Sequence, residues 1–70
     1  MAKEIKITLV AARVNAGYTQ AQAAESLGIS VETIKNIEQG RTDPRVSTVL
    51  QLADLYHIPI DNLILPQKSA

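Results

Sequence analysis

The 70-residue sequence contains no cysteine, no tryptophan and no phenylalanine, and its aromatic content is only 3%. Without cysteine, the chain can form neither a disulfide framework nor a thiolate metal site, and a reducing cytoplasm is the expected location. Hydrophobic residues nevertheless make up 46% of the sequence. The core therefore has to be built from leucine, isoleucine, valine and alanine, which suits short helices.

The sequence also lacks a long apolar run and an excess of charge of either sign. No segment approaches the roughly 20 apolar residues of a membrane-spanning helix, and the N-terminus does not show the apolar block of a signal peptide. Seven lysines and arginines balance seven aspartates and glutamates, so net charge does not indicate a nucleic-acid partner. We expect a single domain over residues 1–70, with no membrane association, metal, cofactor or small-molecule ligand.

The N-terminal residues admit two interpretations. Polar and β-branched residues alternate within residues 1–7, as in a short extended arm, but Ile5 and Leu9 also fall at helical spacing. Thr8 can be an N-cap that separates the two structures. We favour a first helix over residues 9–16, preceded by the arm.

Helix caps and glycines predict where the next two helices begin and end. We expect a second helix over residues 20–27 and a third over residues 31–39. The residues that mark these boundaries are Thr19 and Gln22, which form a capping box, Ser30 as an N-cap, and Gly17, Gly28 and Gly40 as helix-ending glycines.

Prolines indicate the helix boundaries in the C-terminal part. Pro44 precedes a fourth helix that begins at Val46 and ends at Tyr56 or His57. A fifth, short helical turn is predicted over residues 60–65, followed by a loose tail over residues 67–70. Five helical pieces with short connections predict an all-α fold.

Residues 19–40 are the most informative part of the chain. Two helices that cross steeply through a tight turn need small residues at the crossing, a glycine at the bend and apolar anchors beyond it. The residues of these kinds are Ala23, Ala24, Gly28, Ile29, Ile34 and Ile37. This arrangement places a polar third helix on a surface where it can enter nucleic acid.

The same segment, with its flanks, resembles the phage Cro and repressor type of helix-turn-helix family. The likeness covers residues 8–65, and the positions that recur together are Gly17, Thr19, Gln20, Gly28, Ile34, Ile37, Glu38, Gly40 and Pro44. The resemblance implies a compact five-helix DNA-binding domain. It also implies a transcriptional regulator, most plainly a repressor, that binds specific double-stranded DNA as a homodimer.

In such a fold the third helix enters the major groove, so its outward residues are the candidates for reading bases. Asn36 can pair with adenine, and Lys35 can approach the acceptors of guanine. Glu32 can accept from the cytosine amino group, and Val31 can contact a thymine methyl. By similarity to the family, Val31, Glu32 and Asn36 occupy base-reading positions.

The resemblance also implies phosphate contacts and one structural ion pair. The residues at positions where relatives hold phosphates are Thr19, Gln20, Ser30, Gln39, Arg41 and Arg45. Arg13 and Glu38 match a partly buried ion pair that joins the first and third helices in relatives.

Simpler explanations exist for some of these residues. Glu32 can stabilise the positive end of its helix, and Lys35 can pair with Glu32 or Glu38 in solvent. The lone His57 stands where relatives have a helix-ending glycine, so we expect it to interact with the last carbonyls of the fourth helix. A single histidine at a helix end does not make a catalytic triad, and we expect that the chain is not an enzyme.

Two questions stay open at the level of sequence. Neutral charge and the acidic Glu32 also suit a helix-turn-helix module that binds protein, such as an antitoxin or a regulator subunit. For the dimer, the apolar residues 58–65 can form the interface or only close the core of the monomer. Alternatively, Ile5 and Ile7 can pair between chains as a strand.

Overall fold

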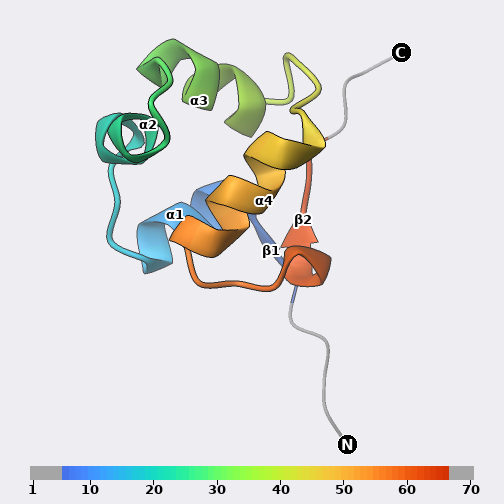
Figure 1. The fold of residues 1–70 in the computed structure, drawn as a ribbon. Coiled ribbons are helices and arrows are strands. Elements are labelled where there is room, and N and C mark those ends of the chain that lie inside the picture. Colours follow the sequence, from blue (N-terminus) through green and yellow to red (C-terminus); the bar gives the residue numbers. More distant parts are fainter. Residues whose placement is uncertain (1–5, 67–70) are drawn as a thin grey trace, which may run out of the picture.

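The computed structural model describes residues 6–66, which fold into four α-helices, one 3₁₀ turn and two short strands (Figure 1). In chain order the elements are β1 (Ile7–Thr8), α1 (Leu9–Asn15), α2 (Gln20–Leu27), α3 (Val31–Glu38), α4 (Val46–Leu55), η1 (Ile60–Asn62) and β2 (Leu63–Ile64). The four predicted longer helices are confirmed, with ends that differ by at most two residues. Residues 1–5 of the predicted arm and the predicted tail at 67–70 lie outside the described part.

The first three helices begin at side-chain caps that the sequence predicts. In each case a hydroxyl oxygen accepts from a backbone N–H in the first turn, which satisfies a donor that has no partner inside the helix. The bonds run from Ala11 to Thr8 at 3.1 Å, from Gln22 to Thr19 at 3.0 Å and from Thr33 to Ser30 at 3.1 Å. The Gln22 side chain also accepts from the Thr19 N–H at 2.9 Å, which completes the capping box.

The turn between α2 and α3 depends on Gly28. Its φ of +73° lies in the left-handed region, and its N–H donates to the Glu25 carbonyl at 3.2 Å. The next N–H, of Ile29, donates to the Ala24 carbonyl at 3.0 Å. These two bonds are the pattern of a Schellman motif. The chain is thereby redirected so that Ser30 can cap α3 two residues later.

The core lies where the four helices and β2 meet. Its buried members are Leu9, Ala12, Ala23, Ala24, Ile34, Ile37, Val49, Leu52, Ala53, Tyr56 and Leu63. The buried residues of α2 are both alanines, Ala23 and Ala24, so α3 can pack closely against it. Leu9, Ile34 and Leu52 are the largest fully buried side chains and come from α1, α3 and α4.

The predicted fifth helix over residues 60–65 is wrong. Only Ile60–Asn62 form a helical turn, and β2 then pairs in parallel with β1, with Ile7 opposite Leu63 and Thr8 opposite Ile64. The residues after the turn alternate, with Leu63 buried and Ile64 exposed. That is the pattern of a strand with one face on the core. The fold is therefore mostly helical, with a small sheet that joins the two ends of the described chain (Figure 1).

This pairing also bears on the predicted N-terminal arm. Ile7 is extended, as predicted, but its strand partner is Leu63 of the same chain. Because the sheet has two strands and β2 pairs with only one edge of β1, pairing of Ile7 between chains stays a prediction. Ile5 lies outside the described residues.

Gly28→Ala tests the role of the turn. A Cβ at this position meets no heavy atom within 4 Å, so the cost comes from the left-handed backbone. We expect the free energy of unfolding to fall by about 1 kcal/mol in chemical denaturation. Gly28→Asn, which tolerates this conformation better, should lose less. Equal stability of Gly28→Ala and the natural chain would contradict the account.

Candidate nucleic-acid interface

Helix α3 has an apolar inner side and a polar outer side. Ile34 and Ile37 are 1% and 3% exposed and pack into the core. Because a helix turns by about 100° per residue, Glu32, Asn36 and Gln39 form a ridge on the opposite side. Glu32 and Gln39 are exposed, and Asn36 is half-buried. This ridge, with its neighbours Val31 and Lys35, is called the α3 outer face below.

The side chains of the α3 outer face are free to meet a ligand. Val31 is 39% exposed, and Lys35 is also exposed. Among the described residues, Lys35 forms no ion pair with Glu32 or Glu38, so the solvent-pair explanation for Lys35 finds no support. Glu32 lies in the first turn of α3, where a carboxylate is favoured by the helix dipole. Glu32 can therefore stabilise the helix, and its exposed carboxylate is also accessible to a base.

Of the six predicted phosphate-binding residues, Gln39 belongs to the α3 outer face itself, and the other five lie on neighbouring segments. Thr19 and Gln20 lie at the start of α2, and Ser30 lies at the start of α3. Gln39, Arg41 and Arg45 follow the end of α3. All six are exposed except Gln20, which is half-buried.

Two features concern the arginines among these residues. The Arg41 N–H donates to the Asn36 carbonyl at 2.9 Å, which ties the residue to the end of α3. Among residues 6–66, the guanidinium groups of Arg41 and Arg45 form no ion pair. Both positive charges therefore remain available to an anion.

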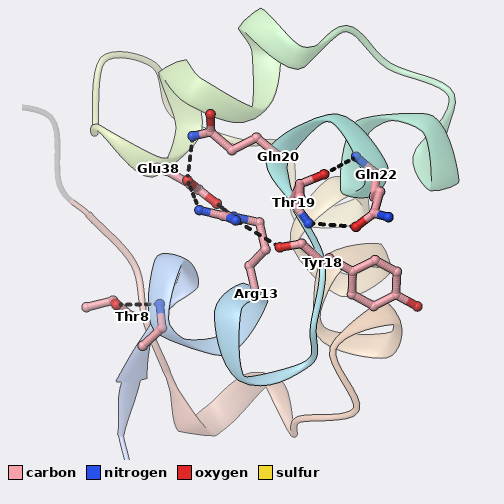
Figure 2. Close-up of polar contacts among 8 residues, drawn as sticks. Thr8, Arg13, Tyr18, Thr19, Gln20, Gln22 and Glu38 are labelled. Atoms are coloured by element: carbon pink, nitrogen blue, oxygen red, sulfur yellow. Dashed lines mark hydrogen bonds and ion pairs between the residues drawn. The ribbon is translucent and has the colours of Figure 1, made fainter.

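A buried carboxylate connects α3 to the rest of the domain (Figure 2). Glu38 Oε2 accepts from Arg13 Nε at 2.7 Å, and the two side chains are only 5% and 12% exposed. Arg13 Nη1 donates to the Tyr18 carbonyl at 2.9 Å, and Gln20 Nε2 donates to Glu38 Oε1 at 2.9 Å. The ion pair expected from the family resemblance is thus present in the structure. We call Arg13, Tyr18, Gln20 and Glu38 the Glu38 network.

Residues 9–63 match a family model described as helix-turn-helix. The chain belongs to the helix-turn-helix family. Its resemblance to the phage repressor type is confirmed by this match together with its similarity to a phage repressor, given in the next paragraph. No solved structure matches the chain.

Several curated proteins are similar to this helix-turn-helix chain. It is 43% identical over 53 residues to the HTH-type transcriptional regulator ImmR of Bacillus subtilis strain 168, covering 76% of this chain and 42% of ImmR. It is 40% identical over 52 residues to the uncharacterized HTH-type transcriptional regulator YazB of the same strain, covering 74% and 75%. It is 37% identical over 60 residues to the cryptic phage CTXphi transcriptional repressor RstR of Vibrio cholerae, covering 86% and 54%. The chain thus spans under half of ImmR and about half of RstR.

Gln20 is engaged in a way that the sequence did not indicate. It was predicted to hold a phosphate, yet one N–H of its amide is directed to Glu38 within this helix-turn-helix unit. The two residues are 18 positions apart, which is beyond any local spacing rule. The amide has a second N–H and an oxygen, so a phosphate contact stays a prediction.

His57 adopts the left-handed conformation that is typical of a helix-ending glycine. Its φ of +56° is left-handed, and its backbone N–H donates to the Asp54 carbonyl at 3.2 Å. Among residues 6–66, no group of histidine, aspartate and glutamate side chains is arranged to hold a metal ion. No helix in that range has the length and apolar character needed to cross a membrane.

Tyr56 lies beside the Glu38 network. Its ring centroid is 6.1 Å from that of Tyr18, with a tilt of 44° between the rings. Burial raises the pKa of Tyr56 to about 12, with a further increase from the negative charge of Glu38 and an opposing effect from Arg13. The neutral phenol is therefore favoured in the folded chain.

The raised pKa of Tyr56 predicts a loss of stability at high pH. Above its ordinary pKa of 10.0, the phenol ionises in the unfolded chain but stays protonated in the folded one. The free energy of unfolding should therefore fall as the pH rises from about 10 to about 12, by on the order of 2 kcal/mol from this group. Denaturation of the natural chain and of Tyr56→Phe across this range measures the difference. Since all other titrating groups are shared, parallel curves would contradict the assignment.

Proposed function

We propose that this chain is a transcriptional regulator of the cytoplasm that binds specific double-stranded DNA as a single domain and acts as a repressor. The observation that carries the proposal is the α3 outer face, a mainly polar and exposed helix surface backed by the buried Ile34 and Ile37. A helix in this arrangement has the size and exposure to enter the major groove. Its relative RstR is named a transcriptional repressor, and ImmR is named a transcriptional regulator.

The proposed base contacts follow from the chemistry of each side chain. Asn36 can donate to and accept from adenine at the same time, and Lys35 can donate to the acceptors of guanine. Val31, at 39% exposure, offers a methyl surface to thymine, and Glu32 offers an acceptor to the amino group of cytosine. No enzymatic activity is proposed, since these groups act by binding alone.

The proposed phosphate contacts position the helix without reading sequence. Arg41 and Arg45 supply positive charge, while the smaller polar groups supply hydrogen bonds; the latter are Thr19, Gln20, Ser30 and Gln39. The acidic Glu32 and Asp43 lie in the same region and are exposed, so the local positive charge is modest. Weak binding to unrelated DNA follows, and preference has to come from base contacts.

We also propose that two copies bind one near-palindromic site, with their α3 helices roughly 34 Å apart. Residues 58–65, the candidate dimer interface, differ in burial. Leu63 is buried, and Ile58 and Ile60 pack against the core. Ile64 and Leu65 are 46% and 38% exposed. These two side chains are the part of the stretch that a second copy can cover.

Asn36→Ala tests the proposed function. We expect it to relax the preference at one or two base positions and to weaken binding to the preferred duplex by about 1 to 3 kcal/mol. The measurement is selection of bound duplexes from a random pool, followed by titration of the preferred one.

Arg41→Ala is the control. It should weaken binding to all duplex sequences alike and reduce the slope of log affinity against log salt concentration by about 0.9. If the Asn36→Ala variant keeps the same base preference, Asn36 does not read bases. If the natural chain shows neither a preferred duplex nor salt dependence, the protein-binding alternative is favoured instead.

Ile64→Asp tests the dimer. We expect two natural chains per preferred duplex by sedimentation, and weaker pairing in the variant because a carboxylate replaces an apolar contact. Val14→Asp is the matched control, since Val14 is likewise an exposed β-branched residue but lies on α1. Saturation of the duplex by one natural chain would contradict the dimer.

A further inference from the structure

We infer that Gln20 is a positioning residue that sets the sequence preference of α3, through its hydrogen bond to Glu38. This inference rests on the proposed function, because it concerns how the same surface discriminates between DNA sequences. It differs from the phosphate role predicted for Gln20, which carries no sequence information.

The place of the bond in the two-helix unit is the first reason. The turn at Gly28 joins the end of α2 to the start of α3, so the opposite ends of the two helices are not linked by the backbone. Gln20 is the first residue of α2, and Glu38 is the last residue of α3. Their bond of 2.9 Å therefore closes the unit at its open end (Figure 2).

The strength of the bond is the second reason. Its acceptor is a carboxylate that is 5% exposed, and hydrogen bonds to ionised acceptors are shorter and stronger than neutral ones. Arg13 holds the same carboxylate through Nε at 2.7 Å and Nη2 at 3.4 Å. Because Arg13 is itself bonded to the Tyr18 carbonyl, the carboxylate is held from the side of α1 and cannot turn away from Gln20 without breaking these contacts.

A consequence for DNA binding follows from this geometry. Specific binding requires the α3 outer face to meet base edges in a defined orientation, whereas unrelated DNA is bound through phosphates alone. If the Gln20–Glu38 bond defines the angle between α2 and α3, its loss lowers affinity for the preferred duplex more than for unrelated duplexes. A residue that only touched phosphate would lower both affinities by the same factor.

Gln20→Met provides the test, because methionine has a similar length but cannot donate a hydrogen bond. In the full chain at fixed salt, we expect affinity for the preferred duplex to fall about five- to tenfold, and affinity for an unrelated duplex to fall by no more than about twofold. The matched control is Gln22→Met. Gln22 is a second glutamine of α2, and its side-chain bond runs to Thr19 and not to α3. This control should leave the ratio of the two affinities unchanged, and thermal melting of both variants monitors their folding.

Two results would overturn the inference. An equal loss on both duplexes would make Gln20 a phosphate ligand only, and no loss on either would make its bond to Glu38 irrelevant to binding. A separate measurement on the free chain distinguishes failure of the proposed function from failure of the inference. The side-chain amide protons of Gln20 should exchange with solvent more slowly than those of the exposed Gln39. If no duplex is preferred but this protection is observed, the proposed function fails although the bond between Gln20 and Glu38 is present. If a duplex is preferred but the two amides exchange alike, the proposed function stands and the inference fails.

Discussion

The arrangement of the helices depends on the contacts that the Glu38 carboxylate makes with Arg13 and Gln20. This carboxylate is almost fully removed from water, and a buried charge is tolerated only when it is paired and hydrogen-bonded. Arg13 supplies the opposite charge from α1, and Gln20 supplies a further donor from α2. Three helices are thus held around one negative group, in a domain whose core otherwise contains small and aliphatic side chains and Tyr56.

This constraint explains how a short neutral chain can hold α3 in place for the proposed contacts with DNA. The inner side of α3 contributes Ile34 and Ile37 to the core, and Glu38 fixes its last turn. On the outer side, Glu32 lies in the first turn, where its charge favours the helix. The polar side chains of the outer side are those proposed to contact base edges.

Local features were predictable from the sequence, and features that join distant residues were not. The caps at Thr8, Thr19 and Ser30 and the left-handed Gly28 act within three or four residues, so composition and spacing identify them. The helical period likewise separates the α3 outer face from its buried side. In contrast, the pairing of β1 with β2 brings together the two ends of the described chain. The bond between Gln20 and Glu38 depends on the angle between two helices, which no local pattern encodes.

The central claim, that the α3 outer face contacts DNA, is tested most directly by chemical-shift mapping. The natural chain would be titrated with the duplex recovered from a random pool, and shifts of the backbone and side-chain amides followed. The account predicts that the largest changes fall on Val31–Asn36 and on the side-chain amide of Asn36, with smaller changes at Thr19 and Arg41. Changes confined to α1, α4 and the small sheet, with α3 unaffected, would contradict it.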